Sequence, residues 1–600
     1  MTAPRYTRFH ALYLAHRLTL RGDARSVIRS LAGCRIDLRR HQVEAAVFAL
    51  NSPLLGGVLL ADEVGLGKTI EAGLVMAQFC AEQRRRILLI VPPSLQRQWQ
   101  EELRQKFRLQ SELLSSRQLK SGVSRSDDMI NEPIIWIVSP GVAARSATFL
   151  EKIDWDLIIV DEAHWLRGLW YASPAQRPAA LQRLLREHFT LLLSATPIQN
   201  SLLDLGALLS LLDQSRFSSA ERFRLTYGDR ESSPERVAAL REAIAPMVSR
   251  RLRSEVRNQL KFTRRQVHTL DFTPSAAEKQ LYIQISDYLN GPTLAFGTTS
   301  KLVLMTARKI LGSSTAAIIG FLETVIARLG RQESASLADL QADLEDSLDE
   351  EELEEGQEAR SNTVPAATAA AFFQEQENLR ACLALAHAVE DDAKLLELLR
   401  ALPEVLDAQA EQGGARKAVI FTQSRRTQEH LAKRLAEAGF SGILLLNGPN
   451  DDSASQEAYA RWQKLKGSRE TRVNPAADKK DAIIHAFRAP DQEILISTDS
   501  GAEGLNLQFC SLLINYDLPW NPQRIEQRIG RCHRYGQQRD VLVINFLNRD
   551  NYAESRLYEL LCTKFALFTD TLGASDEVLG ELHTDIDLED PLVELVGSGR

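Results

Sequence analysis

The chain of 600 residues is poor in cysteine and has no long apolar run. Its six cysteines are scattered without a paired Cys-x-x-Cys spacing, which argues against a zinc site of paired cysteines and against a dense disulfide framework. The longest apolar stretches, such as 87–91 and 157–160, fall far short of the roughly 20 residues needed to cross a bilayer. Residues 1–20 carry three arginines and no clean apolar signal-peptide core. These absences predict a cytoplasmic protein with no membrane partner.

Acidic charge is concentrated in a single stretch. The formal net charge is −7, an unpromising value for a nucleic-acid-binding protein. Residues 343–358 hold ten acidic side chains and no lysine or arginine, so the rest of the chain carries a formal charge of +3. Such a run repels itself and is typical of a solvated insert. The remainder can still present basic grooves, because binding depends on local clusters of charge.

Short apolar runs alternate with helix-like stretches in two parts of the chain. The runs are β-branched or leucine-rich, which suits strands buried on both faces of a parallel sheet covered by helices. The predicted strands are 58–60, 87–91, 134–139, 157–160 and 190–194, then 418–422, 442–446, 493–498, 512–516 and 541–546. The fold class is therefore α/β, with two similar parallel-sheet lobes in tandem. Trp99 is expected to be a core or interface aromatic.

The length implies several folding units, and composition places their boundaries. We expect an N-terminal helical segment at 1–50, a first lobe at 51–213, a mainly helical accessory region at 214–392, a second lobe at 393–565 and a tail at 566–600. Residues 450–481 interrupt the second lobe as an irregular insert with seven lysines and arginines. This insert is either an exposed solvated loop or a surface for a phosphate backbone.

The segment 62–69 reads Asp-Glu-Val-Gly-Leu-Gly-Lys-Thr and lies between a predicted strand and a helical run. A strand, a glycine-bearing loop and a helix hold phosphates, because backbone N–H groups and the positive end of the helix point at the anion. Lys68 can reach the β- and γ-phosphates, and the Thr69 hydroxyl can ligate Mg²⁺. The first glycine of the general pattern is Asp62 here. Taken alone, the motif could be a chance match in a harmless loop.

Two carboxylates follow the predicted strand 157–160. Asp161 and Glu162 begin the sequence Asp-Glu-Ala-His at the carboxyl end of that strand, where open α/β sheets bind ligands. Asp161 would hold Mg²⁺ through water, and Glu162 would orient and deprotonate the attacking water. An acidic pair at a helix amino terminus is the alternative. The preceding phosphate loop favours the catalytic interpretation.

An arginine-bearing segment, 527–537, follows much later in the chain. Arg531 and Arg534 are three residues apart and can share one helix face aimed at a single anion. An arginine delivered from another lobe to the γ-phosphate stabilises the charge of the transition state, with an effect of roughly 10³ to 10⁵ in rate. A solvated helix face is the alternative. The order of the other motifs along the chain favours the catalytic interpretation of these arginines.

The ordered motifs together resemble helicase superfamily two, and more narrowly the Swi/Snf type of double-stranded DNA translocase. The likeness rests on 62–69, on Ser-Ala-Thr-Pro-Ile-Gln-Asn at 194–200, and on 527–537 with its final Tyr-Gly-Gln. The segment 556–580 resembles the bacterial branch related to RapA/HepA. The resemblance covers about residues 35–212 and 390–565. It implies two RecA-like lobes that close on ATP and Mg²⁺.

The resemblance also implies roles for individual residues. Residues 250–256 resemble a basic brace between the lobes, with a charged helix face as the alternative, and 501–508 resembles the motif that couples the lobes. The implied ATP contacts, with Gln42 recognising adenine, are Gln42, Asp62, Glu63, Gly65, Leu66, Gly67, Lys68, Thr69, Gly504 and Gln527. The implied nucleic-acid contacts are Ser94, Gln199, Asn200, Thr498 and Gly501. Side chains of these types hold phosphates without reading bases, which predicts sequence-independent binding.

Three functions follow from the sequence. The first is a double-stranded DNA translocase that remodels or displaces bound protein, either in a bacterial phage-defence system or as a RapA-like motor of the transcription machinery. The second is an RNA-directed helicase, because Asp-Glu-Ala-His also occurs in those enzymes. The third is an ATP-gated subunit of a defence complex, which would need a separate nuclease or methylase because no such motif is visible in this chain.

Overall fold

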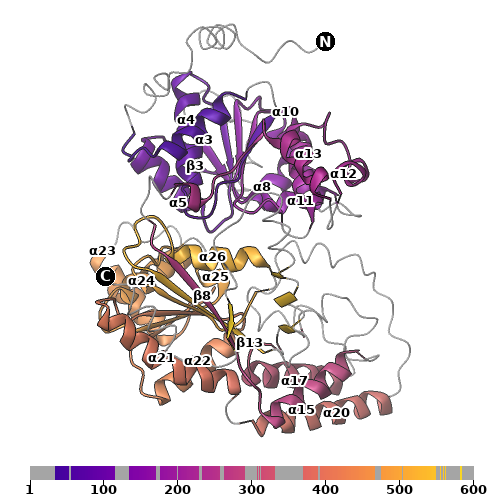
Figure 1. Ribbon diagram of the computed structural model, residues 1–600, viewed down its shortest axis with the longest axis vertical. Coiled ribbons are helices and arrows are strands. Elements are labelled where there is room, and N and C mark those ends of the chain that lie inside the picture. Colours follow the sequence, from indigo (N-terminus) through magenta and orange to yellow (C-terminus); the bar gives the residue numbers. More distant parts are fainter. Residues whose placement is uncertain are drawn as a thin grey trace.

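The computed structural model describes two α/β lobes and a group of helices beside the second lobe (Figure 1). The lobes lie one above the other, with the first lobe uppermost in that view. The residues described are 34–52, 56–114, 134–170, 176–198, 201–228, 233–256, 262–290, 312–331, 369–389, 392–466, 475–502, 505–519 and 521–548, with isolated positions at 307, 310, 554, 555, 558, 559, 561, 562 and 581–583. The acidic insert 343–358 lies outside them.

The first lobe is built on a seven-stranded sheet of order β3-β4-β2-β5-β6-β1-β7, in which every pairing is parallel. The five strands predicted for this half are confirmed to within one residue at each end, and β3 and β7 join the two edges of the sheet. The strands are β1 Gly57–Leu60, β2 Ile87–Ile90, β3 Ser111–Leu113, β4 Ile135–Val138, β5 Leu157–Val160, β6 Thr190–Leu193 and β7 Val248–Ser249.

The second lobe repeats the design with a parallel sheet of order β10-β11-β9-β12-β13-β8-β14. Its five predicted strands are also present, and two more are added at one edge. The strands are β8 Arg265–Asp271, β9 Ala418–Phe421, β10 Ile443–Leu446, β11 Ile494–Ser497, β12 Leu512–Asn515, β13 Val541–Leu547 and β14 Glu581–His583. The predicted class of two RecA-like lobes in tandem is confirmed.

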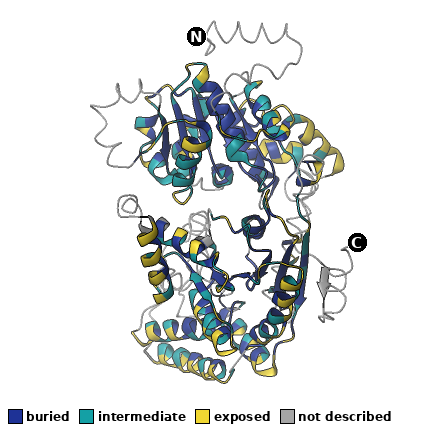
Figure 2. Cartoon of the chain, turned by 90° about the vertical axis from the view of Figure 1, so that its left-hand side faces the viewer, coloured by how far each residue is buried: buried dark blue, intermediate teal, exposed yellow. Residues whose placement is uncertain are grey.

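Both faces of each sheet are buried, which explains the continuous apolar runs. In β1, Leu59 packs into one hydrophobic cluster while Val58 and Leu60 pack into another on the opposite face. In β9, Val419 and Ile420 divide in the same way. Successive side chains of a strand point to opposite faces, so a strand covered on both sides needs apolar residues at every position. Figure 2 shows the strands as the dark blue interior of each lobe.

Helices cover both sheets. Those of the first lobe are α3 Arg40–Leu50, α4 Lys68–Ala81, α5 Gln96–Glu102, α8 Pro140–Arg145, α9 Ala147–Leu150, α10 Gln176–Glu187, α11 Leu202–Leu212, α12 Ala220–Tyr227 and α13 Pro234–Ile244. A π-helical turn, Leu103–Phe107, extends α5, and a 3₁₀ helix, Ala163–Trp170, follows β5. Those of the second lobe are α21 Ala393–Glu411, α22 Arg425–Glu437, α23 Ser453–Lys466, α24 Pro475–Phe487, α25 Asp499–Ala502 and α26 Pro522–Cys532.

The region 214–392 is less uniformly helical than the sequence suggests. Its helices α15 Ala276–Asn290, α17 Thr315–Gly330 and α20 Ala369–His387 pack on one another as a module beside the second lobe. The same region, however, supplies β7 to the first sheet and β8 to the second, and the short helix α14 Arg253–Val256 lies between those strands. A strand of two residues has no recognisable pattern, and the alternation in 265–271 is broken by burial on both faces.

The stretch 450–481 was wrongly predicted to be irregular. Within the described residues it forms α23 and the first part of α24, and Ala458 and Trp462 are buried against the lobe. Its charged residues outnumber its apolar ones, which conceals the apolar stripe that packs the helix.

Among the described helices, none is both long and apolar enough to cross a membrane.

A buried polar network joins the helical module to the second lobe. The Lys394 ammonium donates to Asp517 (3.1 Å) and to the carbonyl of Gly312 (2.9 Å), and the Ser313 hydroxyl donates to Asp517 at 2.7 Å. The Glu554 carboxylate accepts the N–H of Asn548 at 2.8 Å. Burial raises the pKa of Glu554 to about 7, although the Lys394 charge opposes that shift.

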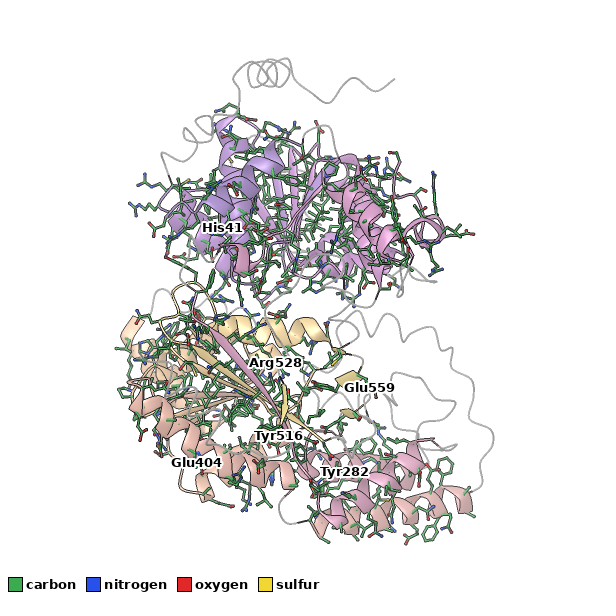
Figure 3. All side chains as sticks on the ribbon, in the orientation of Figure 1. His41, Tyr282, Glu404, Tyr516, Arg528 and Glu559 are labelled. Atoms are coloured by element: carbon green, nitrogen blue, oxygen red, sulfur yellow. The ribbon has the colours of Figure 1, made fainter. Side chains whose placement is uncertain are left out.

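Glu554 should make stability depend on pH. Its pKa is higher in the folded chain than the ordinary 4.5, so its favourable contribution is complete below pH 4.5 and is lost as the pH rises through about 7. We therefore expect Glu554→Gln, which cannot ionise, to raise the melting temperature at pH 8 relative to the wild type by several degrees more than at pH 5. Thermal unfolding of both proteins at the two pH values measures this. The matched control is Glu404→Gln, at an exposed glutamate of α21, which should shift both melting temperatures equally (Figure 3).

Candidate active site

The loop between β1 and α4 has the shape of a phosphate-binding loop. Gly65 and Gly67 adopt φ angles of 89° and 96°, a left-handed region that favours glycine. A Cβ at Gly67 would lie 2.5 Å from Nε2 of Gln42. Helix α4 begins at Lys68, so its free N–H groups face the loop. The Lys68 ammonium donates to the carbonyl of Asp62 at 2.8 Å.

Helix α3 places two side chains against this loop. The Gln42 amide donates to the carbonyl of Leu66 at 2.9 Å, and Nε2 of His41 lies 3.0 Å from the same oxygen (Figure 3 labels His41). Since a carbonyl only accepts, Nε2 of His41 carries the proton. Gln42, the implied adenine contact, therefore lies directly beside the phosphate loop.

The carboxylates of Asp62 and Glu63 face the protein rather than the loop. Asp62 accepts the N–H of Arg251 at 3.0 Å, and Glu63 accepts the N–H of Arg253 at 2.9 Å. Both carboxylates are buried. Asp62, which replaces the first glycine of the general pattern, thus ties the loop to Arg251, and Glu63 ties it to Arg253. As ATP contacts, these two residues can contribute backbone groups.

Glu71, on α4, forms a second buried carboxyl beside Asp62. Its side chain is fully buried, and burial together with the Asp62 charge raises its pKa well above the ordinary range. The two carboxyls can share one proton, with Glu71 as the neutral partner.

Replacing Glu71 with glutamine should therefore be tolerated. The amide mimics a protonated carboxyl, so we expect ATP turnover within about threefold of the wild type and an unchanged melting temperature. Steady-state ATPase assays and thermal melting measure both. Glu71→Lys, which places a charge at the same site, should prevent folding. Loss of turnover in a folded Glu71→Gln protein would mean that Glu71 acts in its ionised form.

The two carboxylates after β5 have different environments. Asp161 accepts the indole N–H of Trp99 at 2.7 Å, and its other oxygen accepts the N–H of Glu162 at 2.9 Å. Burial and the Glu162 charge raise the pKa of Asp161 to about 6. Burial alone would raise the pKa of Glu162, but His164, Lys68 and Arg531 together lower it. Glu162 is therefore the more readily ionised of the two.

Glu162 also has a strained backbone. Its φ is 48°, in the left-handed region that residues with side chains seldom adopt. Strain of this kind is retained where the surrounding structure forces a side chain into a required position. Nδ1 of His164 lies 3.3 Å from the Glu162 carboxylate. The strained turn and the His164 contact thus fix the position of the Glu162 side chain.

The contact of Trp99 with Asp161 was missed by sequence reasoning. Trp99 was expected only as a core or interface aromatic, and it is indeed buried, with 2% of its surface exposed. Nothing in the sequence connects α5 with the end of β5, because Trp99 and Asp161 are 62 residues apart and meet only in the folded chain. Trp99 holds one oxygen of Asp161 in a fixed direction.

The arginines of 527–537 divide into two groups. Arg528 is buried inside the second lobe, where it donates to Asn515 (3.0 Å) and to Asp499 (2.8 Å). Arg531 faces the first lobe closely enough to lower the pKa of Glu162. Arg534 lies over the phosphate loop, since a Cβ at Gly65 would be 3.7 Å from its Cα. Figure 1 shows α26 along the edge of the second lobe nearer the first.

Burial raises the cost of the Arg534 charge. Burial, and then the neighbouring Arg531, lower the pKa of Arg534 to about 10, and its Nε donates to the carbonyl of Gly530 at 2.5 Å. The structure therefore brings Lys68, Glu162, Arg531 and Arg534 together from two lobes. Two adjacent cations in a buried place favour an anion of high charge.

These residues fit ATP with Mg²⁺. Among the described residues, no three His, Cys, Asp or Glu side chains form a metal-binding group. In nucleotide sites Mg²⁺ usually takes one or two protein ligands and completes its shell with phosphates and water. Thr69, at the start of α4, and Asp161 would supply such ligands, while Lys68 and the arginines would face the phosphates. Gln527, on α26, is half-buried.

Three of the five residues implied as nucleic-acid contacts lie within the described part of the chain. Ser94 is exposed after β2, whereas Thr498 and Gly501 are buried after β11. The Thr498 hydroxyl accepts the N–H of Gly501 at 3.3 Å, and a Cβ at Gly501 would lie 2.3 Å from the carbonyl of Leu446. These two residues shape a turn. Gln199, Asn200 and Gly504 lie outside the described residues.

Two parallel-sheet lobes with a phosphate loop and carboxylates on one side and arginines on the other define a helicase-like ATPase. Comparison with known proteins agrees. A family model described as the SNF2-related domain matches residues 41–326, and one described as the helicase conserved C-terminal domain matches residues 397–536.

Individual relatives extend this agreement over nearly the whole chain. An uncharacterised ATP-dependent helicase, YqhH, of Bacillus subtilis (strain 168) is 30% identical over 551 residues, covering 91% of this chain and 81% of that protein. The RNA polymerase-associated protein RapA of Vibrio cholerae (strain M66-2) is 27% identical over 534 residues, covering 86% of this chain and 48% of RapA. The chain thus spans about half the length of that RapA. A solved structure, the Sulfolobus solfataricus SWI2/SNF2 ATPase core in complex with dsDNA, matches with 20% identity and a TM-score of 0.37, covering 90% of this chain and 93% of that one.

The chain belongs to the SNF2-related family of helicase-like ATPases. It is therefore a nucleic-acid-dependent ATPase, as its motifs predicted. The roles of the individual site residues are proposals, which substitution of each residue can test.

Proposed function

We propose that the chain is an ATP-driven translocase on double-stranded DNA that displaces or remodels bound protein. The observation that carries this proposal is the division of the site between lobes, with Lys68 and Glu162 on one and Arg531 and Arg534 on the other. ATP would draw the lobes together, and loss of the γ-phosphate would release them. If each lobe holds the DNA backbone separately, alternate closing and opening becomes movement.

Binding should be independent of sequence and sensitive to salt. Ser94 offers a hydroxyl and backbone groups, which hold phosphates and do not distinguish bases. Mg²⁺, held by Thr69 and Asp161, belongs to the same proposal. A footprint that persists at one DNA sequence in high salt would contradict the proposed mode of binding.

A triplex-displacement assay tests translocation. A third strand annealed to duplex DNA should be released by the intact chain with ATP, and neither Lys68→Ala nor Glu162→Gln should release it. ATPase stimulation by duplex DNA and by RNA, measured in parallel, separates this function from that of an RNA-directed helicase. Stimulation by RNA alone would overturn the assignment to DNA.

A transcription-associated role is the second candidate, and the similarity to proteins named RapA favours it. RNA polymerase core enzyme would then be the protein partner. Co-purification of the tagged chain with that core enzyme tests this role. Recovery of a nuclease or methylase instead would favour a phage-defence complex, the other context predicted from the sequence.

A further inference from the structure

One arginine connects the phosphate loop with the second lobe. Arg253 begins the short helix α14 in the linker between β7 and β8, and 0% of its surface is exposed. A fully buried guanidinium is costly unless every face of it is bonded, because the charge leaves water. Its partners come from both lobes.

On the first-lobe side, Arg253 holds the backbone of the phosphate loop. Its Nε and Nη2 donate to the carbonyl of Val64 at 3.1 and 2.5 Å. Its Nε also lies 3.5 Å from the Glu63 carboxylate, which accepts the Arg253 N–H as well. Two bonds to one carbonyl fix the residue immediately before Gly65. Any movement of the loop on binding phosphate is therefore transmitted to the guanidinium.

On the second-lobe side, the same guanidinium holds His533, which lies between Arg531 and Arg534 in sequence. Nη1 of Arg253 lies 2.9 Å from Nδ1 of His533, and Nη2 donates to the His533 carbonyl at 3.3 Å. Nε2 of His533 lies 2.9 Å from the carbonyl of Thr263. A carbonyl can only accept a hydrogen bond and a guanidinium can only donate one. Nε2 of His533 must therefore carry the proton, and Nδ1 must accept from Arg253.

Aromatic packing encloses this contact. The Phe262 ring lies edge-on to His533 and to Tyr535, with ring centroids 6.4 Å apart in both pairs. The Arg253 guanidinium lies 6.0 Å from the Phe262 ring. Phe262 also packs with Leu66 of the phosphate loop. Water is thereby kept from the bonds, which strengthens them.

We infer that Arg253 is a positioning residue that couples the phosphate loop to the arginines of the second lobe. Arg253 is hydrogen-bonded to Val64 of the loop and to His533, which lies between the two arginines in sequence. The position of the loop therefore determines the positions of Arg531 and Arg534. The inference rests on ATP hydrolysis and not on travel along DNA. Turnover can therefore support or overturn it even if the triplex assay fails.

Two substitutions of His533 separate this role from simple packing. Asparagine places its amide oxygen near the position of Nδ1 and can still accept from Arg253, whereas glutamine places its amide nitrogen near Nε2 and keeps only the bond to Thr263. We expect His533→Asn to retain kcat within about threefold of the wild type, and His533→Gln to lower kcat on the order of tenfold. Equal or reversed effects would overturn the inference.

Arg253→Gln completes the test in the full-length chain. Its kcat should fall on the order of tenfold while the Kd for a fluorescent ATP analogue changes less than about threefold, because Lys68 and Gln42 remain. Adding His533→Gln should cause no further loss, whereas an additive loss would overturn the coupling.

The control is Arg264→Gln, an exposed arginine of the same linker, which should behave as the wild type. Turnover is measured with and without duplex DNA, and thermal melting reports folding. If Arg253→Gln does not fold, the His533 pair decides, since Arg253 stays in place.

Discussion

Glu162→Gln is expected to abolish ATP turnover while preserving nucleotide binding. The glutamine keeps the shape of the side chain and the strained turn, but it cannot take a proton from the attacking water. Loss of a general base lowers kcat by roughly 10² to 10⁴. Steady-state ATPase assays measure the loss, and titration with a fluorescent ATP analogue measures binding.

Lys68→Ala is the comparison for that result. It removes the ammonium that would face the phosphates of bound ATP, so both turnover and binding should fall. A Glu162→Gln protein that turns over ATP within about threefold of the wild type would remove Glu162 from the reaction. Asp161 would then be the remaining candidate of the two carboxylates that follow β5.

Arg531→Ala should cause the second large loss. Arg531 approaches Glu162 from the other lobe, and an arginine that stabilises the transferred phosphoryl group is worth roughly 10³ to 10⁵ in kcat. ATP binding should change little, since Gln42 and Lys68 belong to the first lobe. Single-turnover hydrolysis separates the two effects.

Two further variants serve as controls for Arg531→Ala. Arg531→Lys keeps the charge but loses the planar fork, so it should recover only part of the rate. Arg539→Ala removes an exposed side chain of the second lobe that donates to the carbonyl of Gln412, and turnover should be unchanged. An Arg531→Ala protein with wild-type kcat would show that Arg531 does not act on the phosphate.

Much of the fold could be predicted because parallel strands buried on both faces leave a strong signal. Ten apolar runs were predicted as strands, and all ten are present. Elements with weak or mixed patterns were not recognised. β7 has only two residues, and α23 mixes apolar with charged and polar residues and buries Ala458 and Trp462. The loop 62–69 was recognisable because phosphate binding demands glycine and lysine at fixed spacings.

The linker contacts could not be predicted in the same way. Asp62 and Glu63 belong to a nucleotide motif, yet their side chains bind Arg251 and Arg253, which are far away in sequence. The sequence does not decide whether the segment 250–256 is a basic brace or a charged helix face, because a row of arginines has the same sequence pattern whether it is solvated or buried. Only the packing of β7 beside β1 places these residues against the loop.

Strand β8 has a consequence for how the protein can be divided. It precedes the helical module in sequence but lies between β13 and β14 in the second sheet. A fragment beginning at residue 393 would therefore lack an inner strand and expose β13 along its length. An exposed strand of this kind promotes aggregation. During synthesis on the ribosome, residues 265–271 emerge long before their neighbour 541–547 exists. The sheet of the second lobe can thus be completed only after residues 541–547 have been made.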